Sequence, residues 1–359
     1  MHSVCHRIEN LRSVLLEDTS AVLITSNINR YYYSNFKSSA GAILVTKNTA
    51  TLLVDFRYFE VAQKTVKEPL SVVCYKKLFD EINLIIDKES IKSVIIEEGY
   101  VTVNQLKIFE ESIKANVIHS FNLSEKILGF RMIKSTDEIS LIKKAQEITE
   151  KSFLEILNHI KVGITERQIA IELEHIMKLN GAEGLAFDII SVAGKNTSLP
   201  HGVPTDNKIN NGDFITFDIG SVYNGYHSDM TRTVALGYVT DEMQEVYDIV
   251  LNAHHLASKA IFKGNTCADV DNAARGYIIS MGYGEFFGHS TGHGVGLEIH
   301  EKPTVYCLNN EVLKPGMVIT DEPGIYLPDK FGVRIEDMYL VTDNGYEDLA
   351  HINKELIIL

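Results

Sequence analysis

The sequence predicts an α+β protein of two domains, a smaller α/β domain over residues 1–125 and a larger domain over residues 126–359. Three observations predict this organisation. A chain of 359 residues typically divides into about two domains. Strand-like and helix-like segments alternate in the first third, which indicates helices packed on a mixed sheet. The remainder twice repeats a helix pair followed by strands, which would fold into one curved sheet with helices outside and a cleft between the halves.

In the first domain, apolar periodicity alternates between helical and extended spacing. The predicted helices cover residues 5–16, 57–66, 76–86 and 103–112. The predicted strands cover residues 21–25, 42–46, 51–54 and 93–97, of which the middle two would form a hairpin. No catalytic pattern occurs in this domain, so we expect it to serve packing and dimerisation.

In the second domain, which follows a linker expected around residues 122–134, Ser and Thr capping signals precede amphipathic stretches and predict where helices begin. The first helix pair begins after Ser135 and Thr165 and ends at Asn180 and Gly181. The predicted strands and the second helix pair cover residues 187–193, 240–262, 266–281 and short segments near 289 and 318.

Composition excludes several classes of function. The chain has 34 basic and 48 acidic residues and a net charge of −14, which argues against nucleic acid or anionic membrane as a partner. No run approaches the roughly 18 apolar residues of a membrane span, and the first residues lack the apolar core of a signal peptide. Four widely spaced cysteines form no CxxC motif. We therefore expect a cytoplasmic protein.

Two aspartates eleven residues apart are the first chemical signal. Asp218 ends the strand-like run 214–217, and Asp229 precedes the run 231–236, with a glycine- and asparagine-rich turn between them. Such a segment predicts a β-hairpin, whose ends are adjacent. Two carboxylates brought together in this way would repel each other and raise one pKa unless a cation holds them.

Three later residues extend the pair to a possible metal site. His293 stands among glycines at 292–296, Glu322 ends a strand-like run, and Glu336 lies within another apolar alternation. One imidazole and four carboxylates would balance the charge of two divalent cations. An oxygen-rich set with one histidine suits Mn²⁺, which we expect first, or Co²⁺ or Zn²⁺.

The same residues carry a resemblance that covers nearly the whole chain. The sequence resembles the pita-bread metallopeptidases, in particular the proline-specific branch that contains Xaa-Pro dipeptidase (prolidase) and aminopeptidase P. The matching motifs are Pro200-His-Gly, the Asp218/Asp229 hairpin, His289-Ser-Thr-Gly-His293, His300-Glu-Lys-Pro, Glu322-Pro-Gly-Ile-Tyr and Arg334-Ile-Glu-Asp. The spacing of fourteen positions between Glu322 and Glu336 resembles the interval in compact prolidases.

The resemblance implies a C-terminal pita-bread (creatinase/aminopeptidase) fold behind a creatinase-type N-terminal domain. Residues 29–41 are similar to that domain's signature, although Asn35 and Ser38 replace its internal glycines. It also implies two divalent ions per chain, with Asp229 and Glu336 bridging them. Asp218 would complete one site, and His293 with Glu322 the other.

The resemblance also implies catalytic roles for five residues. Glu322 would shuttle a proton from a metal-bridged hydroxide to the leaving nitrogen. His201 and His300 are candidates for substrate contacts, since a tetrahedral intermediate needs donors at its oxyanion. His289 would contact the prolyl side or the carboxylate of the substrate. Arg334 shares a strand face with Glu336 and would hold a metal-binding carboxylate.

The expected activity is hydrolysis of the Xaa-Pro bond by a homodimeric Xaa-Pro dipeptidase acting on short peptides with proline second. Aminopeptidase P activity on longer peptides is the alternative, because the motifs contain no obvious arginine that would bind the free carboxylate of a dipeptide. Lys302 or a partner subunit would then have to bind that carboxylate. A non-catalytic peptide-binding relative is disfavoured because all five ligand positions are filled. Asp321 precedes Glu322 and should face away from the metals.

Overall fold

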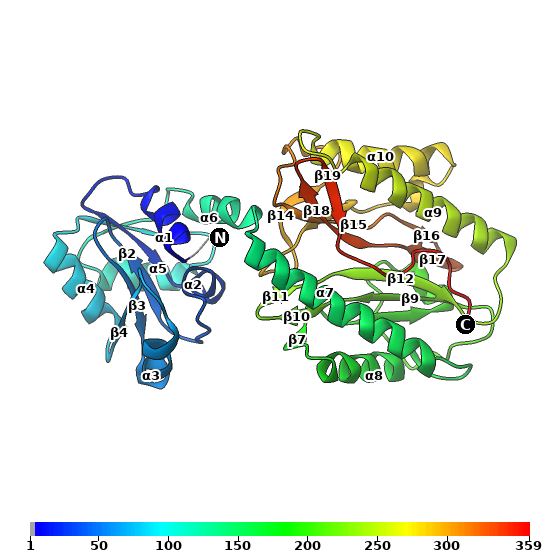
Figure 1. The fold of residues 1–359 in the computed structure, drawn as a ribbon, viewed down its shortest axis with the longest axis horizontal. Coiled ribbons are helices and arrows are strands. Elements are labelled where there is room, and N and C mark those ends of the chain that lie inside the picture. The colour runs from blue at the N-terminus through cyan, green and yellow to red at the C-terminus, as the bar shows by residue number, and fades with distance from the viewer. Residues whose placement is uncertain (1–3) are drawn as a thin grey trace. The chain divides into compact units, whose positions relative to one another are not determined.

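The computed structural model describes residues 4–359 and divides the chain into two compact units, Met1–Arg131 and Met132–Leu359 (Figure 1). The segment predicted as a linker instead forms helix α6 (Leu123–Met132). Its buried residues include Leu123 and Ile127, which lie four apart on one helical face. A linker prediction based on the change of pattern missed this packing.

The first unit is built on a six-stranded mixed sheet in the order β4-β3-β2-β1-β5-β6. β1 pairs antiparallel with β2 and parallel with β5, so the predicted mixed α/β layer is confirmed. The strands are β1 (Ser20–Ile24), β2 (Ala42–Val45), β3 (Ala50–Val54), β4 (Ser71–Cys74), β5 (Ser93–Ile96) and β6 (Asn116–Ile118).

Four of the five helices before α6 were predicted, with ends shifted by a few residues. The helices are α1 (Val4–Arg12), α2 (Asn27–Ser34), α3 (Phe56–Thr65), α4 (Leu78–Glu89) and α5 (Val103–Ser112). Sequence patterns missed α2, which ends at Asn35 in the left-handed conformation with φ of 54°. Asparagine tolerates this conformation, which explains how it stands where the family signature has glycine.

The second unit has two helix pairs, as the repeat predicted. They are α7 (Thr136–Ile156) with α8 (Glu166–Leu179) and α9 (Asp241–Ala260) with α10 (Cys267–Ser280). Ser135 and Thr165 form the predicted capping boxes. Figure 1 shows the strands of this unit between the two pairs, so the helices lie outside, as expected.

The strands of the second unit form several ladders where one continuous curved sheet was expected. β8 (Ile190–Ala193), β9 (Phe214–Ile219) and β12 (Met230–Ala235) form one ladder. A five-stranded ladder contains β14 (Glu301–Val305), β13 (Gly292–Gly294), β15 (Val318–Asp321), β18 (Asp337–Thr342) and β19 (Gly345–Asp348). A single bridge between Thr231 and Glu336 joins them. The interruption falls where the predicted metal ligands lie.

Smaller elements complete the unit, and two apolar cores flank its centre. β7 (Gly184–Leu185), β10 (Ser221–Tyr223) and β11 (Tyr226–His227) form one small sheet, and β16 (Gly324–Leu327) pairs with β17 (Phe331–Arg334). One core lies under α9 and α10, and the other lies under α7 and α8, where Phe153 packs edge-on against Phe217. None of the helices in residues 4–359 is long and apolar enough to cross a membrane.

Candidate metal centre

The predicted hairpin forms the first half of the site. β9 and β12 pair antiparallel, with Asp218 opposite Thr231, and Asp229 lies immediately before β12. The short strands β10 and β11 are inserted between them and join at Asn224 and Gly225, both with positive φ. This turn type matches the twist of the flanking strands. The hairpin thus brings both aspartates to one end of the β9–β12 ladder.

His293 is carried by β13, whose neighbouring strands leave no room for a side chain at the flanking Gly292 and Gly294. A Cβ at Gly292 would lie 2.0 Å from the carbonyl oxygen of Thr320, and one at Gly294 would lie 2.2 Å from that of Lys302. The glycines around His293 therefore allow β14 and β15 to close on both sides. The Thr320 hydroxyl also accepts a hydrogen bond from the His293 backbone N–H.

The five predicted ligands converge, although only three of them fit within one tight group. One ligand atom each from Asp229, His293 and Glu336 lies within 4.8 Å of the others, and all three residues are buried. His293 Nε2 lies 3.4 Å from Asp229 Oδ2 and 3.7 Å from Glu322 Oε1. The hydroxyl of Thr231 donates to Glu336 Oε2 at 2.7 Å.

The electrostatics of this cluster favour a bound cation. Burial, followed by the charges of Asp218 and Glu322, raises the pKa of Asp229 well above its ordinary value. Burial and then Asp229 raise the pKa of Glu336 in the same way. Burial raises the pKa of Glu322 to about 8. Burial and then His300 lower the pKa of His293 to about 4, so its imidazole is neutral and able to ligate.

Asp218 provides a direct test of whether these residues fit a metal. Its Oδ2 accepts a hydrogen bond of 2.7 Å from Arg334 Nη2, while its Oδ1 is buried without a hydrogen-bond partner. A buried carboxylate oxygen without a partner is costly. A divalent cation would satisfy it, and oxygen donors with one imidazole are a ligand set that such cations use. The residues fit the group.

Arg334 connects this carboxylate to the surrounding chain. It is buried, and it donates to the Thr231 hydroxyl, to the Pro200 carbonyl at 3.2 Å and to the Tyr326 hydroxyl at 2.8 Å. Tyr326 in turn lies 2.9 Å from His289 Nε2. Sequence patterns assigned no role to Tyr326 or Thr231, since a hydroxyl within an apolar strand looks like an ordinary core residue.

His289 is half-buried, and both of its ring nitrogens have protein partners. Nδ1 lies 2.8 Å from the Ser290 carbonyl and so carries the proton, and Nε2 accepts from the Tyr326 hydroxyl. Burial lowers its pKa to about 4. A neutral imidazole with both nitrogens engaged orients Tyr326, and a direct ionic contact with a substrate carboxylate would break these bonds.

His201 and His300 differ from His289 because both are exposed. The His300 ring packs edge-on against His293 with ring centroids 4.3 Å apart. His201 follows the short helix η2 (Gly194–Ser198) and lies close enough to contribute to the lowered pKa of His289. Lys302 lies on the exposed face of β14.

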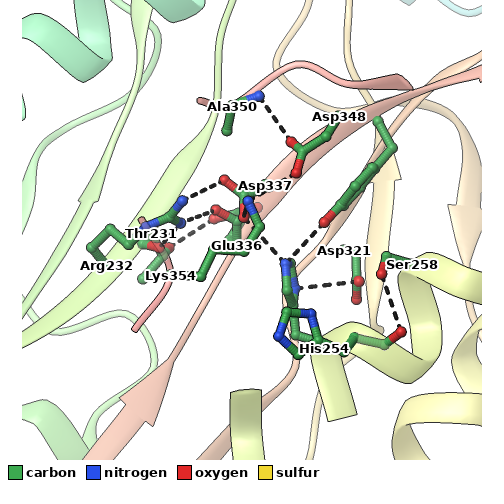
Figure 2. Close-up of polar contacts among 12 residues, drawn as sticks. Thr231, Arg232, His254, Ser258, Asp321, Glu336, Asp337, Asp348, Ala350 and Lys354 are labelled. Atoms are coloured by element: carbon green, nitrogen blue, oxygen red, sulfur yellow. Dashed lines mark hydrogen bonds and ion pairs between the residues drawn. The ribbon is translucent and has the colours of Figure 1, made fainter. Parts of the chain in front are cut away.

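A second polar cluster, which includes His254, Asp321 and Asp337, was not predicted (Figure 2). Asp321 is fully buried and its Oδ2 lies 3.3 Å from His254 Nδ1, so it faces away from the metal ligands, as the strand alternation predicted. His254 Nε2 lies 3.1 Å from Asp337, and Arg232 Nη2 lies 2.7 Å from Asp337. Burial acts to raise the pKa of Asp337, but Arg232 and its other partners outweigh it and lower that pKa.

Arg232 links this second cluster to the ligands. Its Nη1 donates to the carbonyl oxygens of Thr231 and Glu336 at 2.9 and 2.8 Å. A buried arginine between two threonines of β12 was visible in the sequence as a charge inside a strand. Sequence patterns assigned no role to His254, and the structure places it, fully buried, between Asp321 and Asp337.

These features define a class: an α+β protein with two helix pairs outside its strands and a buried, carboxylate-rich site that could hold a metal ion. The family model described as "Metallopeptidase family M24" matches residues 140–343, and the one described as "Creatinase/Prolidase N-terminal domain" matches residues 7–133. The chain belongs to metallopeptidase family M24, and the resemblance found in its sequence is confirmed.

Known relatives are similar over almost their full length. A Xaa-Pro dipeptidase from Pyrococcus furiosus is 41% identical, with 98% of this chain and 99% of the relative covered. The structure of a Xaa-Pro dipeptidase from Bacillus anthracis is 40% identical with a TM-score of 0.95, covering 99% and 100% of the two chains. That of an X-Pro aminopeptidase from Thermotoga maritima is 36% identical with a TM-score of 0.91, covering 98% and 100%.

The raised carboxylate pKa values predict how the metal-free protein responds to pH. The pKa of Glu322 rises from its ordinary 4.5 to about 8 in the folded chain, so the folded state holds a proton that the unfolded state has released. The free energy of unfolding of metal-free protein should therefore fall as pH rises from about 4.5 to about 8. Thermal melts of chelated and metal-loaded protein should show a Tm difference that widens over this range.

A matched variant separates this effect from general titration. Glu322→Gln removes the titrating carboxyl itself, so the fall in the unfolding free energy of the metal-free protein between about pH 4.5 and about 8 should largely disappear, and the stabilisation by metal should weaken with the loss of a predicted ligand. A Tm difference between the two forms that stayed constant with pH would contradict the assigned electrostatics.

Proposed function

We propose that this protein is a metal-dependent exopeptidase that hydrolyses the Xaa-Pro bond of dipeptides. The observation that carries the proposal is the convergence of four carboxylates and His293 in a chain about 40% identical to proteins named Xaa-Pro dipeptidase. A peptide-binding protein without catalysis would have no use for this buried concentration of negative charge.

The metal content is part of the proposal. Two divalent ions per chain, with Mn²⁺ as the first choice, would be held by Asp218, Asp229, His293, Glu322 and Glu336. Support comes from charge, because four carboxylates balance two such ions, and from the partnerless Oδ1 of Asp218. When bound, these ions would supply Lewis acidity that lowers the pKa of a water molecule at the scissile carbonyl.

Glu322 moves the proton in this mechanism. Its carboxylate accepts a proton from the attacking water as the oxygen–carbon bond forms, and it gives that proton to the prolyl nitrogen as the carbon–nitrogen bond breaks. Its position supports this role because Oε1 lies 3.7 Å from His293 Nε2, at the ligand cluster. Arg334 holds Asp218 by a hydrogen bond of 2.7 Å and so keeps that carboxylate in place.

His201 and His300 would supply hydrogen bonds to the substrate. Both rings are exposed, and His300 lies against His293. Donors placed where charge develops stabilise the tetrahedral intermediate of amide hydrolysis. His289 would act through Tyr326, whose hydroxyl donates to it, so that its ring forms part of the wall near the prolyl side.

The substrate preference gives the test of the proposal. A bond to proline nitrogen has no N–H, and the ring fixes φ near −65°. A site fitted to that ring should lose about 10–200-fold in kcat/KM when alanine replaces the proline, the usual effect of a shape difference in an apolar pocket. Hydrolysis of Ala-Pro and of Ala-Ala by the metal-loaded protein should be compared. Equal values of kcat/KM would refute proline specificity.

A Xaa-Pro aminopeptidase is the second candidate, and the similarity to the Thermotoga maritima enzyme favours it. Ala-Pro and Ala-Pro-Ala distinguish the two activities, because an aminopeptidase tolerates a continuing chain where a dipeptidase binds a free carboxylate. We expect faster turnover of the dipeptide. A clear preference for the tripeptide would establish the second candidate instead.

The cellular location and the oligomeric state are also part of the proposal. We infer a cytoplasmic homodimer that binds short peptides and no nucleic acid or membrane. All four cysteines are free, which is typical of proteins from reducing compartments, and the net charge of −14 disfavours polyanionic partners.

A further inference from the structure

The loop that carries His201 leaves the scaffold after β8 and returns to it near α8, and one buried carboxylate holds both of its ends. Glu166 is the first residue of α8 and is fully buried. Its side chain accepts five hydrogen bonds, all from residues 193–207. The base of the loop is therefore organised around a single side chain.

The five donors are divided between the two arms of the loop. On the departing arm, Glu166 Oε1 accepts from the Ala193 N–H at 2.8 Å and from Asn196 Nδ2 at 2.9 Å. On the returning arm, Oε2 accepts from the N–H and the hydroxyl of Thr205 at 2.9 and 2.7 Å, and Oε1 accepts from Asn207 Nδ2 at 3.1 Å. The carboxylate therefore closes the loop at its base.

The tip of the loop makes separate hydrogen bonds with two residues of β17, Gly332 and Arg334. The Pro200 carbonyl accepts from Arg334 Nη1 at 3.2 Å, and the Thr197 hydroxyl accepts from the Gly332 N–H at 2.8 Å. His201 follows Pro200 directly, and its ring is exposed. The loop is thus held on both sides of His201, at its two arms and at Thr197 and Pro200, while the ring itself is exposed.

The charge of Glu166 suits this position. Burial acts to raise its pKa, but the hydrogen bonds from Thr205, Ala193 and Asn196 outweigh burial and lower it. Its place in the first turn of α8 adds the favourable field of the helix N-terminus. A buried carboxylate that is ionised and fully hydrogen-bonded makes a stiff support, because hydrogen bonds to a charged acceptor are strong and leaving any one donor unpaired is costly.

We propose that Glu166 is a positioning residue for the hydrolysis, acting through the loop to hold His201 at the scissile carbonyl. The inference rests on the proposed function, since it needs His201 to contact the substrate. The hydrogen bonds of the Glu166 carboxylate all come from the loop, and none comes from a predicted metal ligand. Its contribution is the placement of a donor, and a displacement of about 1 Å at such a group can lower a rate by about 10²-fold.

The test replaces the carboxylate by the amide of the same size. Glu166→Gln should lower kcat for Ala-Pro by about 10-fold to 10²-fold with little change in KM and with the metal content of the wild type. In a His201→Ala background the same substitution should produce a much smaller further loss, because the donor that Glu166 positions is already gone. Losses that multiply fully in the double variant would overturn the proposal.

A matched control excludes a general effect of destabilisation. Glu97 is also fully buried and accepts four hydrogen bonds, from Thr25, Ser26 and Asn29, within the first unit. Glu97→Gln should leave kcat unchanged. Hydrogen exchange should show faster amide exchange over residues 193–207 in Glu166→Gln and not in Glu97→Gln.

Thr205→Val provides a milder variant should Glu166→Gln not fold. It removes one of the five donors while keeping the shape of the side chain, and it should give a smaller loss of kcat with faster exchange of the same loop. Faster exchange with an unchanged kcat would overturn the positioning role while leaving the proposed function intact. A metal-loaded wild type that is inactive on Ala-Pro would instead overturn the proposed function and the inference that rests on it.

Discussion

Asp229→Ala should abolish both metal binding and peptide hydrolysis. Asp229 is buried between His293 and the other carboxylates, with its Oδ2 3.4 Å from His293 Nε2. The family resemblance implies that Asp229 would be shared by two cations, so its removal should affect both. We therefore expect wild-type protein to hold about two divalent ions per chain and the variant to hold close to none. Chelation of the wild type should abolish turnover in the same way, and added Mn²⁺ should restore it.

The measurement is metal analysis of purified protein beside turnover of Ala-Pro. Asp343→Ala is the matched control, since that carboxylate is exposed and pairs with Lys263 at 2.7 Å. It should keep both metal and activity. A chelated wild type with full peptidase activity would refute the metal mechanism altogether.

His201→Ala should lower kcat by about 10²–10³ while leaving the metal content near that of the wild type, the usual loss for one oxyanion donor. The reason is that His201 is exposed on a loop held by its backbone, and its ring supports none of the contacts among the five predicted ligands. Its loss should therefore remove a hydrogen bond to the intermediate without disturbing the carboxylates. Single-turnover kinetics with metal analysis of the same preparation would measure both quantities.

His175→Ala supplies the control, because His175 is an exposed histidine on α8. Its kcat should match the wild type. Collapse of metal occupancy in His201→Ala would instead make His201 a ligand and would contradict its proposed role as a hydrogen-bond donor to the substrate.

Much of the fold could be predicted because its signals are local. The helices after Ser135 and Thr165 begin at capping boxes, which need only four consecutive residues, and long amphipathic periods extend from them. Several short strands were missed, among them β4, β6, β14, β16, β17 and β19, since short strands have no period that separates them from other apolar runs. In the second unit we expected one curved sheet, because the residue pattern of a strand does not show where its hydrogen-bonded partner strand ends.

The sequence allowed us to predict the acidic residues of the candidate site, but not its neutral residues. Asp218, Asp229 and Glu336 stand out because charge within an apolar strand is costly without a partner. Tyr326 could not be found in this way, since a phenol in a strand is an ordinary core residue until its hydroxyl is seen between Arg334 and His289. The arrangement depends on tertiary contacts that join residues far apart in the chain.

The two polar clusters on either side of the ladder have a consequence for how the strands find their register. Asp321 and Asp337 directly neighbour Glu322 and Glu336, so a slip of either strand by one residue would keep an acid on one side only. The other side would receive Thr320 or Pro323 from the first strand, or Ile335 or Met338 from the second. Hydrophobic pattern alone would penalise such a slip less than usual. The two sides nevertheless demand different side chains, because Arg232 and His254 fit the short Asp337 at 2.7 and 3.1 Å. The adjacent acids, each with its own partners, therefore distinguish the correct alignment of these strands from an alignment shifted by one residue.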